Sequence, residues 1–125
     1  MTLDKVKRVL IVDDDEMMRD FIKEVLREYN CKIFEAENGK EGLQQFRKNH
    51  PDIVITDIIM PEMEGISFIR ELRADNKNIP IIAMTGNIHG RMEEYLDISS
   101  KLGADNILRK PLNPAELLEA IDNII

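Results

Sequence analysis

The sequence predicts an α/β fold in which a parallel β-sheet is covered by helices on both faces. Short runs rich in valine and isoleucine alternate with amphipathic helical patterns, and this alternation occurs five times. Four of the runs are almost wholly aliphatic, as expected for strands that are buried on both faces. Because 125 residues is the length of one domain, we expect residues 1–125 to form a single unit.

The strands are expected where the aliphatic runs lie. These are Arg8 to Val12, Lys32 to Ala36, Ile53 to Thr56, Pro80 to Met84 and Asn106 to Leu108. The second run differs from the others because polar and apolar residues alternate along it. Such alternation is typical of a strand with one exposed face, so we expect this strand at an edge of the sheet.

Helices are indicated between the strands by apolar side chains at helical spacing. The clearest stripes are Met18, Ile22, Val25 and Tyr29; Ile66, Ile69 and Leu72; and Leu117, Ile121 and Ile124. Asn38 and Asn113 each stand three residues before a glutamate, which is the pattern of a helix N-cap, and Pro114 suits a first helical turn. A further helix, with Met92, Tyr95 and Leu102 as its stripe, is expected after a glycine-containing loop.

Composition excludes several classes of function. The 17 basic and 24 acidic side chains give a net charge of −7 without a basic cluster, so we expect no direct nucleic-acid binding by this domain. The apolar runs are far shorter than the roughly 18 residues that span a bilayer, so no membrane role is expected. A lone Cys31 and an N-terminus without an apolar signal segment indicate a reducing, cytoplasmic location. His50 and His89 fall in predicted loops, so a Zn²⁺ site is not expected.

Polar side chains stand where the predicted strands end. Asp13 and Asp14 follow the first strand, Asp57 the third, Thr85 the fourth and Lys110 the fifth. Right-handed crossovers bring these ends to one edge of a parallel sheet, which is where ligands bind. Each residue alone could be a helix cap, a turn residue or a solvated charge. Because several strands end in this way, the sequence predicts a functional site at this edge.

Three carboxylates in one pocket need compensating positive charge. Two carboxylates about 5 Å apart repel by roughly 3 kcal/mol at an effective dielectric constant near 20. If Asp13, Asp14 and Asp57 are all ionised beside Lys110, the pocket has a net charge of −2, which one divalent cation would neutralise. Carboxylate oxygens are hard ligands, so the expected ion is Mg²⁺ or Mn²⁺.

A carboxylate beside a hard cation, a hydroxyl and an ammonium group indicates a phosphoryl acceptor. Asp57 would be the nucleophile, the metal and Lys110 would neutralise the phosphoryl oxygens, and Thr85 would donate a hydrogen bond to one of them. The chain lacks both GxxxxGK[ST] and GxGxxG, so bound ATP is not the expected donor.

These residues resemble the receiver domains of bacterial two-component response regulators over essentially the whole chain. The matching segments are Val9 to Asp14, Asp57 to Gly65, Met84 to Gly86, Gly103 to Asp105, and Lys110 with Pro111. The resemblance implies a (βα)₅ flavodoxin-like, doubly wound fold with strand order 2-1-3-4-5. It also implies a phosphorelay or two-component partner for the chain, namely a sensor histidine kinase or a histidine phosphotransfer protein.

The resemblance also assigns roles to single residues. Asp57 would accept the phosphoryl group, and Thr85 and Lys110 would contact it. Asp14 and Asp57 would bind Mg²⁺ directly with the backbone carbonyl of Ile59, while Asp13 would act mostly through water. The Lys110–Pro111 bond is commonly cis in this family, and Asp15 and Glu16 are expected to serve only the start of the next helix. Output would pass to a downstream protein target or an attached output domain.

Two positions bear on how the family pattern applies to this chain. Ile107 stands where many relatives have tyrosine or phenylalanine, so an aromatic side chain coupled to Thr85 is missing. Ile59 and Asn87 occupy the positions that influence water access to the acyl phosphate. We expect the apolar Ile59 to shield the phosphate and lengthen its lifetime, which an Ile59→Asn variant would test by losing phosphate faster.

Two other functions compete with a phosphorylated switch. One is a metal-dependent phosphohydrolase with an aspartyl-phosphate intermediate, similar to haloacid-dehalogenase-like enzymes, because Asp13 to Asp15 offer a DxD start. That pattern continues with threonine or valine where this chain has Met17, which disfavours it. The other is a degenerate receiver that binds partners without phosphorylation, and the presence of all five edge residues disfavours that function.

Overall fold

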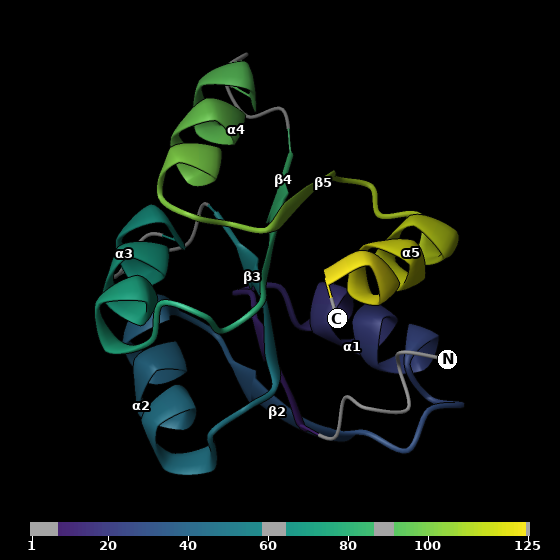
Figure 1. The fold of residues 1–125 in the computed structure, drawn as a ribbon. Helices are drawn as coiled ribbons and strands as arrows, with labels where there is room; N and C mark the ends of the chain where they lie inside the picture. Colours follow the sequence, from purple (N-terminus) through teal and green to yellow (C-terminus); the bar gives the residue numbers. More distant parts are fainter. Residues whose placement is uncertain (1–7, 59–64, 87–91, 125) are drawn as a thin grey trace.

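The computed structural model describes residues 8–58, 65–86 and 92–124, in which five strands alternate with five helices (Figure 1). The strands are β1 Arg8–Val12, β2 Lys32–Ala36, β3 Ile53–Asp57, β4 Ile81–Thr85 and β5 Asn106–Arg109. The helices are α1 Glu16–Val25, α2 Gly39–Asn49, α3 Gly65–Asp75, α4 Met92–Lys101 and α5 Pro114–Ile124. The predicted α/β fold is therefore confirmed.

The strands form one parallel sheet in the order β2-β1-β3-β4-β5. This is the order that the resemblance implied, and β2 lies at an edge as its alternating pattern predicted. Three strands run one residue past their predicted ends, to Asp57, Thr85 and Arg109. The reason is that backbone pairing continues through a polar side chain, as in the pairing of Asp57 with Met84.

The sheet divides the core into two layers. Alternate strand residues point to opposite faces, so Val9 and Ile11 pack in one cluster while Leu10 and Val12 pack in the other. The first cluster contains Ile22 from α1 and residues from α5, and the second contains residues from α2 and α3. Figure 1 shows α1 and α5 on one side of the sheet and α2, α3 and α4 on the other.

The helix starts follow the predicted caps. Asn38 accepts a hydrogen bond from the Glu41 amide at 2.8 Å, Asn113 accepts one from the Ala115 amide at 2.8 Å, and Asp15 caps α1 by accepting from Met17. One helix end was predicted wrongly, because α1 ends at Val25. Tyr29 lies in the turn after it and packs against the first core cluster from there.

Not every predicted helical side chain falls in the described part of the structure. Leu102 packs against the second core cluster just after α4, whereas the side chains of Met92, Tyr95 and Ile124 lie outside the described residues. Among the helices that the structure describes, none is long and apolar enough to cross a membrane.

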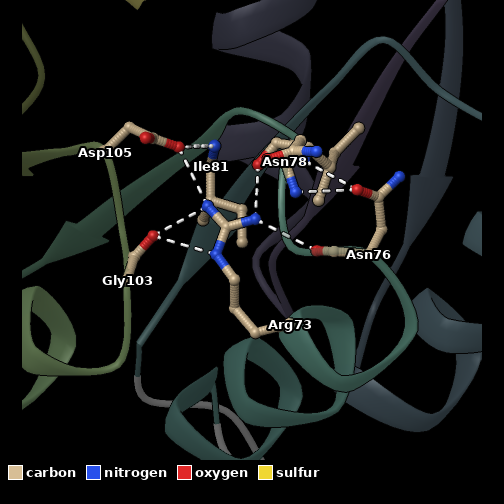
Figure 2. A network of polar contacts seen from close by, with 7 residues as sticks. Arg73, Asn76, Asn78, Ile81, Gly103 and Asp105 are labelled. Carbon is tan, nitrogen blue, oxygen red and sulfur yellow. Dashed lines mark hydrogen bonds and ion pairs between the residues drawn. The ribbon is translucent and has the colours of Figure 1, made fainter.

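An arginine network joins α3 to the segment between α4 and β5 at the amino edge of the sheet (Figure 2). Arg73 donates to the carbonyl of Gly103 from Nε at 3.1 Å and from Nη2 at 2.7 Å. It also donates to the carbonyl of Ile79 at 2.7 Å and to Asp105 at 3.0 Å. Asp105 in turn accepts from the amide of Ile81, the first residue of β4, at 2.8 Å. The network therefore fixes the starts of β4 and β5.

Gly103 is required in this network for two reasons. Its φ of +102° lies in the left-handed region that favours glycine, and an added Cβ would stand 3.0 Å from Arg73 Nε.

Candidate functional site

The carboxyl edge of the sheet brings together the polar residues that the strand ends predicted. Asp13 and Asp14 follow β1, Asp57 ends β3, Thr85 ends β4, and Lys110 follows β5. One carboxylate oxygen from each of Asp13, Asp14 and Asp57 lies within 4.8 Å of the other two. Asp13 and Asp57 are buried and Asp14 is exposed, so the cluster opens to solvent on the Asp14 side.

Lys110 joins two of these carboxylates. Its Nζ lies 3.0 Å from Asp13 Oδ2 and 3.0 Å from Asp57 Oδ2, although the two aspartates come from different strands. The Lys110 amide donates to the carbonyl of Thr85 at 2.8 Å, which fixes the backbone of the lysine beside the end of β4. Burial alone would lower the pKa of Lys110, but the charges of Asp57 and Asp13 outweigh burial and raise it. The lysine is therefore held as a cation, and the peptide bond to Pro111 is cis.

Asp13 is the most enclosed of the three carboxylates, with no exposed surface. Its Oδ1 accepts from the amide of Asp15 at 2.9 Å, while its own amide donates to the carbonyl of Ala36 at the end of β2. Burial raises the pKa of Asp13, and the bonds from Asp15 and Lys110 only partly offset this effect. Ionised Asp13 is thus costly for the fold and would gain from additional positive charge.

The backbone around Asp57 is fixed from behind by a glycine. The Gly65 amide at the start of α3 donates to the carbonyl of Ile58 at 2.8 Å. A Cβ at position 65 would stand 2.1 Å from the carbonyl oxygen of Asp57, so no larger residue fits without displacing the strand end. The Thr56 hydroxyl donates to this same carbonyl at 2.9 Å. These contacts fix the backbone from which the Asp57 side chain extends at the carboxyl edge of the sheet.

Thr85 is buried at the end of the neighbouring strand. Its hydroxyl donates to the carbonyl of Gly86 at 3.1 Å. A hydroxyl proton rotates freely about its C–O bond, so this group can turn toward an acceptor that arrives at the edge. Thr85 is thus available as a donor beside the acidic cluster.

The donor set fits a small divalent cation. Within residues 8–58, 65–86 and 92–124, the group of acidic, histidine or cysteine side chains close enough to share an ion is Asp13, Asp14 and Asp57. All three donors are carboxylates, which Mg²⁺ and Mn²⁺ prefer, and with Lys110 they carry a net charge of −2 if ionised. Ile59, whose carbonyl was expected as a further ligand, lies outside the described residues, as does Asn87.

Neither Cys31 nor His50, both in the described part of the chain, joins this cluster. Cys31 precedes β2 and packs against the first core cluster, and burial raises the pKa of its thiol. His50 is exposed at the end of α2, where its φ of 48° places it in the left-handed region. His89 lies outside the described residues.

Ile107, which stands where the resemblance led us to expect an aromatic residue, lies in β5. It is partly buried and packs against the second core cluster. Its described surroundings are therefore those of an ordinary core residue.

Sequence reasoning assigned no role to two residues that support the site, Arg19 and Gly65, although Gly65 ends one of the segments that carry the resemblance. Arg19 in α1 donates from Nη1 to the main-chain carbonyl of Asp13 at 2.6 Å. Both residues support the site through contacts with backbone atoms, whose positions residue type and spacing do not reveal. Arg19 directly follows Met18 of the apolar stripe of its helix and lies six residues after Asp13. This position could have indicated that its side chain lies close to the acidic loop.

Comparison with known proteins gives a consistent result. The model of the response regulator receiver domain family matches residues 9–122, which include the whole acidic edge. The chemotaxis protein CheY of Halobacterium salinarum is 34% identical over 119 residues, covering 95% of this chain and 97% of that protein. The histidine kinase P4 of Formosa agariphila is 38% identical over 119 residues, which make up 94% of this chain and 8% of that protein.

Solved structures agree with the sequence relatives. A response regulator receiver domain protein from Clostridium thermocellum superposes with a TM-score of 0.86 at 32% sequence identity. The superposition covers 96% of this chain and 94% of that chain. The similarity therefore extends over the five strands and the helices on both faces of the sheet.

Proposed function

Because this chain belongs to the response regulator receiver domain family, we propose that it is a signalling switch that accepts a phosphoryl group on Asp57. In this proposal residues 1–125 form one receiver domain that works in the cytoplasm. Receiver domains are signalling domains, so the chain promotes only its own phosphorylation and dephosphorylation. The observation that carries the proposal is the 3.0 Å ion pair between Lys110 and Asp57 beside the carboxylates of Asp13 and Asp14.

Asp57 has the surroundings that a nucleophile needs. It is held at the strand end by backbone contacts, and its carboxylate requires no general base because it attacks in its ionised form. A carboxylate oxygen of Asp57 forms a P–O bond while the P–N bond of a phosphohistidine breaks. The imidazole leaves with the bonding electron pair, and an acyl phosphate remains on Asp57.

The other edge residues stabilise the charge of the transferred group. Phosphoryl transfer spreads negative charge over three oxygens, and fixed donors lower its barrier. The ammonium of Lys110 pairs with one phosphoryl oxygen, and the hydroxyl of Thr85 donates to another. Asp13, Asp14 and Asp57, with the carbonyl of Ile59, are the residues that would hold Mg²⁺ or Mn²⁺. The bound cation supplies positive charge for the phosphoryl oxygens.

The partners follow from this chemistry. The donor is the phosphohistidine of a sensor histidine kinase or of a histidine phosphotransfer protein. Phosphorylation adds negative charge at the carboxyl edge and changes the surface offered to partners. The output goes to a downstream protein or to an attached output domain, because receiver sequences form nearly all of the CheY relative and a small part of histidine kinase P4.

Incubation with acetyl phosphate tests the proposal without a cognate kinase. The unaltered chain, Asp57→Asn and Glu16→Gln are incubated with and without Mg²⁺, and intact masses are measured at near-neutral pH. Glu16 is an exposed residue in the first turn of α1 that does not belong to the carboxylate cluster, so its variant is the matched control. We expect one Mg²⁺-dependent phosphoryl adduct on the unaltered chain and on Glu16→Gln, and none on Asp57→Asn.

Other outcomes point to the competing functions. An adduct that persists on Asp57→Asn would contradict the assignment of the acceptor. No adduct on a folded chain that binds Mg²⁺, when a range of histidine kinases also fails to label it, would indicate a degenerate receiver. Steady release of phosphate from many phosphomonoesters would instead indicate a phosphohydrolase.

A further inference from the structure

Arg19 contacts the backbone of the acidic loop. Its Nη1 donates to the main-chain carbonyl of Asp13 at 2.6 Å, which is part of the peptide unit that joins Asp13 to Asp14. The Arg19 side chain is 13% exposed, so this bond is largely protected from water. Within the part of the chain that the structure describes, Arg19 hydrogen-bonds Glu35 and the Asp13 carbonyl, and neither acceptor is a carboxylate of the cluster. Arg19 therefore contacts the connection between two site residues rather than their side chains.

The guanidinium is fixed from its other side by β2. Arg19 Nε donates to Glu35 Oε1 at 3.0 Å, and Lys23 Nζ lies 2.9 Å from the second oxygen of the same carboxylate. Although burial opposes it, hydrogen bonds from Lys23 and Arg19 lower the pKa of Glu35, which keeps the anchor ionised. A planar guanidinium holds its donors in fixed directions toward two acceptors, whereas a lysine ammonium is a point charge on a flexible stem.

Other contacts leave the Asp13–Asp14 peptide dependent on Arg19. The Asp13 amide is held by Ala36, and the Asp13 side chain is held by Asp15 and Lys110. The carbonyl of Asp13 is held by Arg19. Rotation of this peptide would carry the Asp14 carboxylate away from the 4.8 Å cluster, because Asp14 begins at that peptide's nitrogen.

We propose that Arg19 is a positioning residue that fixes the Asp13–Asp14 peptide and thereby orders the two carboxylates for a divalent cation. This inference rests on the proposed function, because it takes the acidic cluster to be a Mg²⁺ site. Residues that orient metal ligands from outside the coordination shell contribute to affinity, and their loss typically costs about 10-fold to 100-fold in metal affinity.

The direction of the effect separates positioning from simple electrostatics. Arg19→Gln removes a positive charge from the neighbourhood of the carboxylates. Charge alone would then make Mg²⁺ bind more tightly, since one repulsive cation is gone. Loss of positioning makes Mg²⁺ bind more weakly. The two causes therefore predict opposite changes in the dissociation constant.

The test measures Mg²⁺ dissociation constants by isothermal titration calorimetry on unphosphorylated protein. The chains are the unaltered protein, Arg19→Gln, Arg19→Lys and Arg27→Gln. Arg27 makes an exposed ion pair with Glu24, so its variant matches the charge change without touching the loop. We expect Arg19→Gln to bind Mg²⁺ about 10-fold more weakly, Arg19→Lys to bind it several-fold more weakly, and Arg27→Gln to bind as the unaltered chain does.

Hydrogen exchange without Mg²⁺ gives a second readout. The Asp15 amide donates to Asp13 Oδ1 at 2.9 Å, so it reports the order of the acidic loop. We expect faster exchange at Asp15 in Arg19→Gln and Arg19→Lys, with unchanged exchange in the β3 strand.

Each remaining outcome has a definite meaning. Equal or tighter Mg²⁺ binding by both Arg19 variants overturns the inference and leaves the proposed function intact. Weaker binding without faster Asp15 exchange also overturns it, because the loop is then not what Arg19 orders. Absence of Mg²⁺ binding by the unaltered chain would contradict the proposed metal site and the inference together.

Discussion

Arg73 lies at the end of the sheet where its strands begin, and Lys110 lies at the opposite end. The charges around these two basic residues differ. At the amino edge, Arg73 makes five hydrogen bonds, which go to the carbonyls of Gly103, Asn76 and Ile79 and to Asp105. These bonds match the five N–H groups of a guanidinium. At the carboxyl edge, Lys110 faces the buried carboxylates of Asp13 and Asp57, with Asp14 close by.

The difference separates a structural cluster from a site. Around Arg73 the acceptors are mainly main-chain carbonyls and a single carboxylate balances the charge, so the network needs nothing further. Around Lys110 one cation stands among three carboxylates, so the cluster has unbalanced negative charge that a ligand can neutralise. Interactions at the amino edge are expected to affect stability, whereas those at the carboxyl edge are expected to couple stability to Mg²⁺.

Replacing Arg73 should have the largest effect on stability. Arg73→Met leaves several partly buried acceptors without a donor, and hydrogen bonds to charged groups contribute about 1.5–3 kcal/mol each. We expect a loss of about 3 kcal/mol and a fall in Tm of roughly 10 °C, with or without Mg²⁺. Thermal unfolding monitored by circular dichroism measures the change. Arg70→Met, at an exposed position of the same helix, is the control, and equal Tm values for the two variants would contradict the structural role of the network.

Replacing Lys110 should give a smaller loss that Mg²⁺ can restore. Lys110→Met leaves Asp13 and Asp57 facing one another without their shared cation, and the lysine side chain is 22% exposed. We expect a loss of about 2 kcal/mol without divalent cations, below the usual cost of breaking a fully buried ion pair. Millimolar Mg²⁺ should recover most of it by binding the folded state. Urea unfolding with and without Mg²⁺ measures this recovery, and a loss that Mg²⁺ leaves unchanged would contradict the charge imbalance.

The sheet could be predicted from the sequence because its determinants are local. Four aliphatic runs and one alternating run marked the five strands, and asparagine caps marked the starts of α2 and α5. Strand ends were off by one residue at Asp57, Thr85 and Arg109, because hydrophobicity does not show that a polar residue still pairs through its backbone. The turn that ends α1 before Tyr29 was missed because the apolar stripe continues past it.

The two edges differed in how far the sequence predicted them. The acidic edge was accessible because its residues end strands, and parallel topology brings strand ends together. The Arg73 network was not, since most of its acceptors are backbone carbonyls whose positions depend on the folded chain. The same holds for the contacts by which Arg19 and Gly65 support the site, which are with the backbone of Asp13 and Asp57. Backbone contacts between distant segments are what residue types and spacing leave undetermined.

Removing one carboxylate from the acidic cluster should stabilise the fold slightly. Burial is the main cause of the raised pKa of Asp13, and the charge of exposed Asp14 raises it further, so Asp14→Asn relieves repulsion between the two. We expect the free energy of unfolding without Mg²⁺ to rise by under about 1 kcal/mol, because solvent screens an exposed charge. Mg²⁺ affinity should fall at the same time. Urea unfolding and calorimetry measure the two changes, with Glu28→Gln, at an exposed position in the turn after α1, as the control that alters neither. A stability loss without Mg²⁺ would contradict the predicted repulsion.

The smallest expected effect is on how the free energy of unfolding depends on pH. Glu35, which pairs with two cations, and Asp13, which lies among three carboxylates, should change it in opposite directions. Burial acts to raise the pKa of Glu35, but the hydrogen bonds from Lys23 and Arg19 outweigh burial and lower this pKa below 4.5. The stability that ionised Glu35 contributes is therefore present above pH 4.5 and is lost as the pH falls through the folded-state pKa. Burial raises the pKa of Asp13 above 3.8. The stability that protonated Asp13 contributes is therefore lost as the pH rises through its folded-state pKa.

Glu35→Gln isolates the first of these contributions. The difference in the free energy of unfolding between this variant and the unaltered chain should be under about 1 kcal/mol at pH 7, because the Glu35 side chain is 35% exposed. It should shrink as the pH falls below 4.5, since a protonated Glu35 no longer pairs with two cations. Urea unfolding from pH 3 to 7 measures it. A difference that stays constant over this range would show that Glu35 stabilises the fold through packing rather than through its charge.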